Sequence, residues 1–305
     1  MSPAEQEKRC ISSARHGQEV DQESCRRFRR QENCREFRNR EKERTEKMKL
    51  GRIAWFEEAD FQSAKEQGME FIELDVNSRA QEFLDHLDVI RQRSQEYGMP
   101  VGAVGRWGSN RIGKEGICQD ELELEYRLIE AAASLNCNVY ITGCNYVEEL
   151  SYYENCGLAI SYFEKLIAFG AEKGVKIAVY NCRWNNFVCT PMAYTMIHGY
   201  LKDLYIKYDP SHCIYDGGDY LKEARDWGDR FLHVHLKGSL VIDGERFDDP
   251  PAGMDQTNWG AFLAILYAKG YDRCLSIEPH SANWKGELGD KGVDYTIRYF
   301  KNLIL

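Results

Sequence analysis

Residues 231–237 read Phe-Leu-His-Val-His-Leu-Lys, a short apolar run in which two histidines alternate with aliphatic residues. Successive side chains of a β-strand point to opposite sides, so His233 and His235 are expected to share one side of this strand. An apolar outer side and a polar inner side suit the wall of a closed barrel that is covered by helices. The run therefore predicts a barrel strand that places both imidazoles in the lumen.

Seven more short apolar runs occur along the chain, and segments with apolar residues at helical spacing lie between them. Gly98, Gly174 and Gly270 stand where such helices should end, as suits left-handed C-terminal caps. Eight βα units in the 258 residues from Met48 onward match a single (β/α)8 TIM barrel of the α/β class. No GxGxxG turn follows the first run, which disfavours an open dinucleotide-binding sheet. The predicted strands are Lys49–Trp55, Phe71–Val76, Val101–Arg106, Asn138–Gly143, Lys176–Tyr180, Tyr205–Tyr208, Phe231–Leu236 and Cys274–Glu278.

The first 47 residues differ in composition from the rest of the chain. They contain 13 Lys or Arg and 10 Asp or Glu side chains and almost no aliphatic residues, so there is little apolar surface to bury. We expect residues 1–47 to be a charged extension of low order and residues 48–305 to be the barrel. Met48 directly precedes the first predicted strand. The segment Glu41–Lys47 would be encoded by purine-rich codons, as a ribosome-binding site is, so Met48 is the expected native start.

Composition excludes several classes of protein. No run approaches the roughly 20 apolar residues of a membrane span, and no signal peptide opens the chain. The net charge of −9, or −12 from Met48 onward, disfavours nucleic acid as a partner. The 11 cysteines are irregularly spaced and include no Cys-x-x-Cys pair, which favours free thiols in a reducing cytoplasm.

Polar side chains gather at the ends of neighbouring predicted strands, which is where a TIM barrel places its chemistry. Asp209, His235 and Glu278 could converge on one divalent cation; otherwise they only hydrogen-bond to one another and close the barrel. Mixed oxygen and imidazole ligands suit Mn²⁺, with Mg²⁺, Co²⁺, Fe²⁺ or Zn²⁺ as alternatives. Four of the seven histidines lie at the ends of three adjacent strands: His212, His233, His235 and His280.

Aromatic residues at the same end suit a carbohydrate ligand. Trp107 follows the third predicted strand, where its flat face could stack on a sugar ring, although packing between loops is the competing explanation. No phosphate-binding glycine-rich turn or paired arginine fork is evident, which slightly favours an unphosphorylated sugar. Tyr152 and Tyr153 could form a contact between copies of the chain, so the sequence is compatible with a homo-oligomer.

Three ordered motifs resemble the xylose isomerase-like TIM barrels of the sugar isomerase and epimerase superfamily. They cover most of the C-terminal half of the predicted barrel, and the loop 249–253 with the following Asn258-Trp259 is similar as well. The motifs are Asp209-Pro210-Ser211-His212, His233-Val234-His235-Leu236-Lys237 and Ile277-Glu278-Pro279-His280.

The resemblance implies a divalent metal held by Glu, Asp, His and Glu from strands five to eight. Three of these ligands correspond to Asp209, His235 and Glu278, while Tyr180 stands at the position of the first glutamate. It also implies that His212 contacts substrate. In addition, the family often has Asp after the lysine of strand seven, where this chain has Gly238.

The leading interpretation is a sugar or polyol isomerase or epimerase that removes a proton next to a carbonyl group, aided by the metal. Glu278 would be the base and Tyr180 the acid, while Lys237 would position substrate hydroxyls. A lyase acting on keto-sugars or glycosides, and a metal-free carbohydrate-binding barrel, are the alternatives. A nuclease is disfavoured because strands two to four offer only Glu73 and Asp75 as further ligands.

Overall fold

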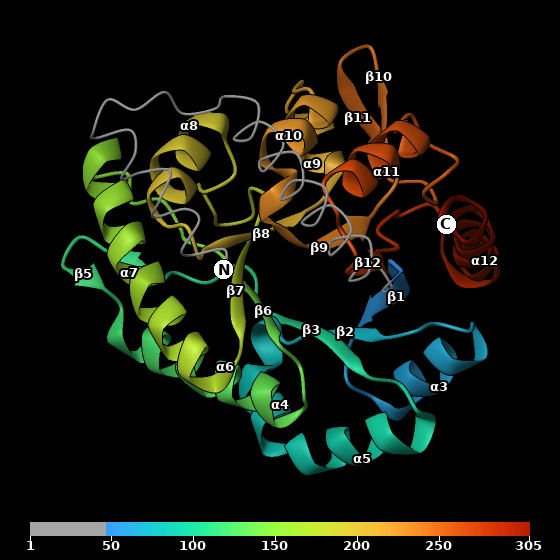
Figure 1. Ribbon diagram of the computed structural model, residues 1–305, viewed down its shortest axis with the longest axis horizontal. Helices are drawn as coiled ribbons and strands as arrows, with labels where there is room; N and C mark the ends of the chain where they lie inside the picture. The colour runs from blue at the N-terminus through green and yellow to red at the C-terminus, as the bar shows by residue number, and fades with distance from the viewer. Residues whose placement is uncertain (1–46) are drawn as a thin grey trace, which may run out of the picture. The chain divides into compact units, whose positions relative to one another are not determined.

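Eight parallel strands close into a barrel in the order β1-β12-β9-β8-β7-β6-β3-β2, with helices around it (Figure 1). The computed structural model describes residues 47–305, which confirms the predicted (β/α)8 TIM barrel, and each predicted strand agrees within one residue at each end. The predicted extension, apart from Lys47, lies outside the described residues. The barrel strands are β1 (Lys49–Ala54), β2 (Ile72–Asp75), β3 (Val101–Gly105), β6 (Val139–Thr142), β7 (Lys176–Tyr180), β8 (Tyr205–Tyr208), β9 (Phe231–Leu236) and β12 (Cys274–Ile277).

Helices connect the strands, and two small hairpins extend from the loops. The longer helices are α3 (Glu58–Glu66), α5 (Leu87–Tyr97), α6 (Gln119–Ser134), α7 (Tyr152–Lys173), α10 (Tyr220–Trp227), α11 (Trp259–Ala268) and α12 (Gly286–Leu303). Shorter turns of helix are η1 (Asn77–Arg79), α4 (Ala80–Asp85), α8 (Pro191–Ala193), η2 (Tyr194–His198), α9 (Pro210–Tyr215) and η3 (Gly228–Arg230). The hairpins pair β4 (Ile112–Gly113) with β5 (Gly116–Ile117), and β10 (Leu240–Ile242) with β11 (Glu245–Asp248).

Local signals in the sequence explain where several helices begin and end. Gly98 and Gly174 cap α5 and α7 with φ of 59° and 73°, a left-handed conformation that favours glycine. Asp219 and Asn258 begin α10 and α11 by accepting hydrogen bonds from the backbone N–H groups of Lys222 and Ala261. The two glycine caps confirm helix ends that the sequence predicts.

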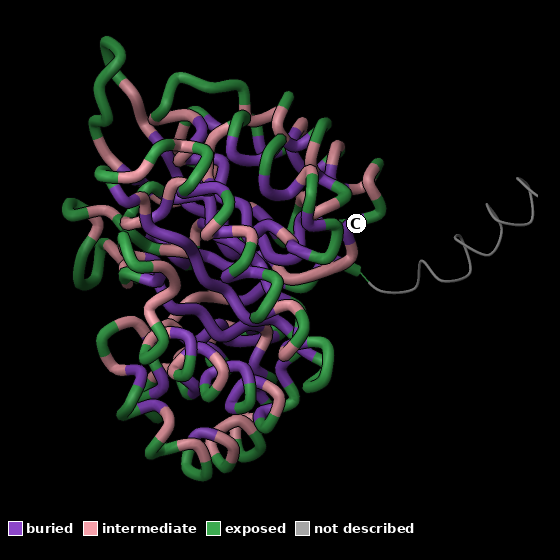
Figure 2. The backbone as a smooth tube through the Cα atoms, turned by 90° about the vertical axis from the view of Figure 1, so that its left-hand side faces the viewer, coloured by how far each residue is buried: buried purple, intermediate pink, exposed green. Residues whose placement is uncertain are grey.

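The strand register decides which side chains occupy the lumen. Tyr180, Lys207 and His233 are paired across β7, β8 and β9, so their side chains share the inner side. Figure 2 shows buried residues concentrated along the strands and on the inner sides of the helices. The lumen is therefore closed by polar as well as apolar side chains, and several of these belong to the site described below.

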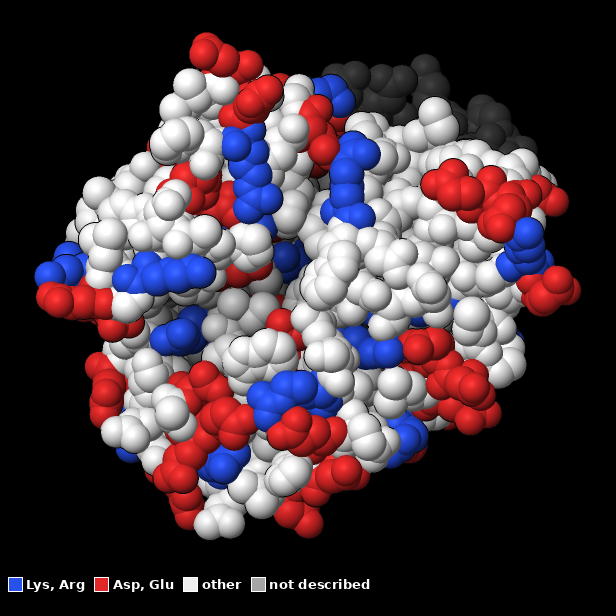
Figure 3. All heavy atoms as spheres, turned by 180° about the vertical axis from the view of Figure 1, so that it is seen from behind, with Lys and Arg blue, Asp and Glu red and all other residues white. Residues whose placement is uncertain are grey.

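Other features of the described chain bear on its class. The eight cysteines within residues 47–305 are free thiols, as predicted, and the other three lie outside the described residues. None of the helices in residues 47–305 is long and apolar enough to cross a membrane. Acidic and basic side chains are interspersed over the face seen in Figure 3, which is hollowed near its centre.

Gly143, just after β6, tests how tightly the lumen is packed. A Cβ atom there would lie 2.4 Å from Cζ of Tyr180, so we expect Gly143→Ala to lower the free energy of unfolding by about 1–3 kcal/mol. Gly157→Ala is the matched control, because Gly157 is an exposed residue of α7 with open space around it. The control should be neutral or stabilising by up to about 1 kcal/mol. Urea denaturation measures both, and equal stability of the two variants would contradict this packing.

Candidate active site

A cavity of about 460 Å³ opens at the C-terminal ends of the barrel strands. This is within the range of sizes that holds a small ligand. Its walls come from side chains that are far apart in the sequence and that the strands bring together. Among the lining residues are Asp75, Trp107, Lys207, His212, His235, Lys237 and Glu278.

Beneath this cavity, the carboxylate of Glu73 on β2 is buried between the two histidines of β9. Its Oε2 atom lies 2.8 Å from Nε2 of both His233 and His235. Burial alone would raise the pKa of Glu73, but the two imidazoles hold it well below its usual range. The carboxylate is therefore ionised and fixes the orientation of both rings.

His235 is held between two carboxylates. Its Nε2 atom faces Glu73, and its Nδ1 atom lies 2.8 Å from Oε2 of Glu278. Carboxylate oxygens only accept hydrogen bonds, so both ring nitrogens donate here. Although burial lowers the pKa of His235, Glu73 and Glu278 raise it above the ordinary value. His233 differs, because burial lowers its pKa and its Nδ1 atom has no hydrogen-bond partner.

Asp209 begins α9 and at the same time faces the site. Asn181 fixes its backbone by donating to the Asp209 carbonyl and accepting from its N–H group. The Oδ1 atom accepts a hydrogen bond from the N–H group of Ser211, which is the N-cap interaction. The other oxygen, Oδ2, is buried and receives no directed hydrogen bond.

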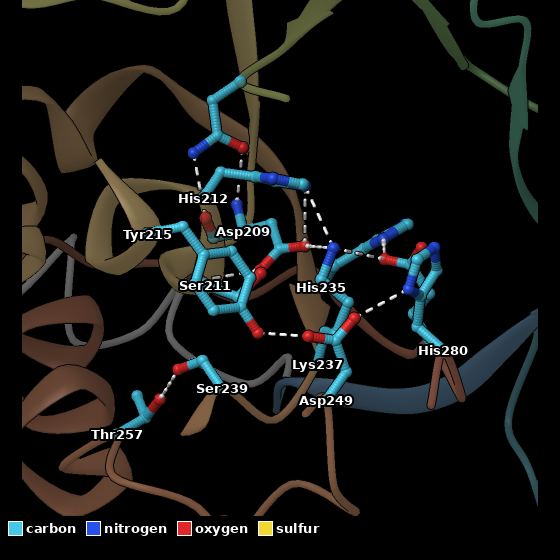
Figure 4. A network of polar contacts seen from close by, with 12 residues as sticks. Asp209, Ser211, His212, Tyr215, His235, Lys237, Ser239, Asp249, Thr257 and His280 are labelled. Carbon is cyan, nitrogen blue, oxygen red and sulfur yellow. Dashed lines mark hydrogen bonds and ion pairs between the residues drawn. The ribbon is translucent and has the colours of Figure 1, made fainter. Parts of the chain in front are cut away.

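Lys237 lies at the centre of the polar cluster (Figure 4). Its Nζ atom is 3.0 Å from Nε2 of His212, 3.0 Å from Oδ2 of Asp209 and 3.7 Å from Oε2 of Glu278. The ammonium donates to His212, so Nε2 of that ring is unprotonated, and burial accordingly lowers the pKa of His212. The side chain of Lys237 is thus placed against both site carboxylates.

The residues present fit a divalent cation. One atom each of Asp209, His235 and Glu278 lie within 4.8 Å of one another, and Oδ2 of Asp209 has an unused lone pair. The contact from His235 to the buried carboxylate of Glu73 matches the second contact that metal-binding histidines commonly make. Glu73, His233 and His235 are also close enough for a metal, but their hydrogen bonds already account for that group.

Tyr180 is not part of this cluster. Its ring is buried and stacks on Trp107 with ring centroids 5.8 Å apart, while its hydroxyl donates to the carbonyl of Trp184 at 3.1 Å. The same oxygen accepts from the N–H group of Gly108. Trp107 lines the cavity, whereas the Tyr180 hydroxyl is directed at the backbone.

The structure gives a steric reason why a glycine stands at position 238. A Cβ atom at this position would lie 1.9 Å from the carbonyl oxygen of Pro250, so the following loop passes directly over the glycine. No larger residue fits without a shift of the backbone. The aspartate that the family resemblance implies here is therefore excluded by the path of the loop.

Asp75 and Lys207 also face the cavity, although sequence analysis assigned neither of them a role in the site. Asp75 ends β2 and accepts two hydrogen bonds from Asn77. Burial, followed by the charges of Glu73 and Glu278, raises its pKa to about 7. The alternation of side chains along a strand could have identified both residues from the sequence. Asp75 is two residues after Glu73, and Lys207 is two residues before Asp209, so each pair shares one side of its strand.

Comparison with known proteins identifies the family of this barrel and several solved structures with the same fold. The family model described as xylose isomerase-like TIM barrel matches residues 61–303. The solved structure of 3-keto-D-glucoside 4-epimerase from E. coli is 17% identical, covers 84% of this chain and 100% of its own, and has a TM-score of 0.66. D-allulose 3-epimerase from Methylomonas sp. with D-allulose is 16% identical over 85% and 98%, with a TM-score of 0.67. No curated protein matches the chain.

A third solved structure has a different activity in its description. It is the probable 3-DHS dehydratase from Bacillus anthracis, 16% identical over 84% of this chain and 99% of its own, with a TM-score of 0.65. At these identities the likeness shows the fold of residues 47–305.

Glu73→Gln tests the buried carboxylate. We expect it to lower the free energy of unfolding at pH 7 by about 3–5 kcal/mol, because it removes one partner of a buried charged cluster. A carboxyl whose pKa is depressed on folding stabilises above its unfolded pKa of about 4.3, and this contribution is lost as the pH falls. The difference from wild type should therefore shrink on acidification, as measured by urea denaturation at several pH values. The exposed Glu123→Gln is the control, and a pH-independent difference would contradict the expectation.

Proposed function

We propose that this chain, which belongs to the xylose isomerase-like TIM barrel family, is a sugar isomerase or epimerase that removes a proton from the carbon next to a carbonyl group. One observation supports this most directly: the Glu278 carboxylate faces a sugar-sized cavity beside Asp209, His235 and Lys237. The epimerases among the similar folds act on keto-sugars according to their descriptions, which favours the same substrate class.

Glu278 is the proposed base. Burial would raise its pKa, but Lys237 and His235 hold it well below the ordinary value, so the carboxylate is ionised at neutral pH, as a base must be. Lys237 and His212 then position a substrate hydroxyl or carbonyl oxygen near the carboxylate. Trp107 offers a flat apolar surface for the sugar ring.

Asp209, His235 and Glu278 would hold a divalent cation through Oδ2, Nδ1 and a carboxylate oxygen, and binding would release the proton that Nδ1 donates to Glu278. When bound, the cation supplies positive charge next to the substrate oxygen on which negative charge develops. We propose Mn²⁺ as the ion, with Mg²⁺, Co²⁺, Fe²⁺ or Zn²⁺ as alternatives.

Asp75 is the proposed acid, in place of Tyr180. Because its pKa is raised to about 7, Asp75 is about half protonated at neutral pH and faces the cavity. Burial keeps the Tyr180 phenol protonated as well, but its hydroxyl is directed at the backbone. Two carboxyl groups with pKa values shifted in opposite directions suit an acid and a base.

A lyase is the second candidate, since a protonated Asp75 could equally donate to a leaving hydroxyl after Glu278 removes the proton. The dehydratase among the similar folds supports this candidate. The close contact of the Lys237 ammonium with Asp209 and Glu278 is the feature that favours the third candidate, a metal-free carbohydrate-binding barrel.

Proton exchange in D₂O tests the proposal. Keto-sugars including D-fructose, D-tagatose and D-allulose, together with a 3-keto-D-glucoside, are incubated with the protein, and NMR follows deuterium incorporation and product. We expect Glu278→Gln to lower both rates about 10²–10⁴-fold. Asp75→Asn should retain exchange and lose product formation, which in wild type should fall as the pH rises through about 7. Exchange that survives in Glu278→Gln would overturn the assigned base.

Metal content tests the proposed ligands. Protein purified without chelator should contain about one divalent ion per chain, and the double variant Asp209→Asn/Glu278→Gln should lose it. Asp229→Asn is the matched control and should retain the ion, because Asp229 is exposed and pairs with Lys269 outside the cavity. Elemental analysis measures the metal content of each protein, and calorimetric titration measures its binding of Mn²⁺. A wild-type protein that binds no cation would favour the metal-free barrel.

A further inference from the structure

Lys207 is a buried lysine inside the barrel that the proposed mechanism does not use. It lies on β8 in register with Tyr180 and His233, so its side chain is in the lumen, below the level of Asp209. The residue is 2% exposed and lines the cavity. Its ammonium is therefore at the inner end of the space where substrate would bind.

Within residues 47–305, no hydrogen bond or ion pair joins the Lys207 ammonium to another side chain. The other basic residues that line the cavity are all paired with acids. Lys237 contacts Asp209 and Glu278. Arg183 contacts Asp216 at 2.7 Å, and Arg246 contacts Asp249 at 3.0 Å through Nε.

The neighbours of Lys207 in residues 47–305 interact with its charge only at longer range and form no ion pair with it. Cys182 interacts with it electrostatically, but burial raises the pKa of this thiol, so it stays neutral. The two carboxylates that interact with Lys207 electrostatically are Asp209 and Glu278, and both already have other partners: Asp209 contacts Lys237, while Glu278 contacts His235 and Lys237. The position of the family's strand-five glutamate, which would have been an acidic neighbour on β7, is occupied by Tyr180. Burying an ammonium without a partner costs free energy, so an anion from outside the chain is its natural counter-charge.

We propose that the substrate of this cavity carries a carboxylate that pairs with Lys207, so that the protein acts on a sugar acid rather than on a neutral sugar. This inference rests on the proposed function, because it names the substrate class of the same site. A single unpaired ammonium matches the single charge of a carboxylate. A phosphate group usually takes several cationic or backbone N–H donors.

Matched pairs of acid and neutral ligand test the proposal by equilibrium binding. The probes are D-glucuronate against D-glucuronamide, D-galacturonate against D-galactose, and D-gluconate against D-glucitol. Trp107 and Trp184 line the cavity, so tryptophan fluorescence can report binding. We expect wild type to bind at least one acid about tenfold or more tightly than its neutral partner. Lys207→Met should abolish that preference, whereas Lys49→Met should retain it, since Lys49 begins β1 at the opposite end of the barrel.

Thermal unfolding of Lys207→Met without ligand gives an independent measurement. Methionine replaces an unpaired buried ammonium with an apolar group, so the midpoint should rise or stay unchanged. A clear fall would show that Lys207 has a structural role and would contradict the proposal. Equal binding of acid and neutral probes by wild type would overturn it as well.

Two further outcomes distinguish this inference from the proposed function. If the preference for acids persists in Lys207→Met, Lys207 is not the group that binds the carboxylate. If D-glucose 6-phosphate binds more tightly than every acid, the anion that the cavity binds is not a carboxylate. Either result leaves the assignment of Glu278 as base standing, since proton exchange tests that separately. Conversely, loss of proton exchange with the acid preference intact would overturn only the proposed reaction.

Discussion

The buried carboxylate of Glu73 is the contact on which the site geometry depends. It joins β2 to β9 across the lumen and leaves Nδ1 of His235 directed at Glu278. Without that negative charge, His233 would be buried with no acidic partner in residues 47–305, and His235 would keep only Glu278. Asp209, Lys237 and Glu278 lie around this one oriented ring, so the geometry of the proposed site and the stability of the barrel depend on the same ion cluster.

The absence of the strand-five glutamate changes the charge balance of this cavity. Tyr180 fills its place with an aromatic ring that stacks on Trp107 and hydrogen-bonds to the backbone, which converts a reactive position into a packing position. Lys207 consequently has no acidic neighbour at the paired position of β7. The proposed acid and the proposed substrate class are both consistent with that replacement.

The barrel was predictable because each strand is a short apolar run with its own helix signals nearby, and such signals are local. The cluster of Asp209, His235 and Glu278 was predictable for a related reason, since parallel strands bring their C-terminal ends together. The direction of the Tyr180 side chain was not, because it depends on the missing side chain of Gly143 on a neighbouring strand and on a carbonyl at Trp184. The partners of Glu73 and the lack of a partner for Lys207 are likewise properties of the closed lumen, which no single segment encodes.

Gly238 adds a constraint on how this site can change over evolutionary time. The Pro250 carbonyl occupies the space of any Cβ atom there, so a side chain at this position requires a rerouted loop before it can be tolerated. Replacing Gly238 by the aspartate that the family resemblance implies would thus need two coordinated changes, of which the first alone would be harmful. A side chain at this position is therefore difficult to reach by single substitutions.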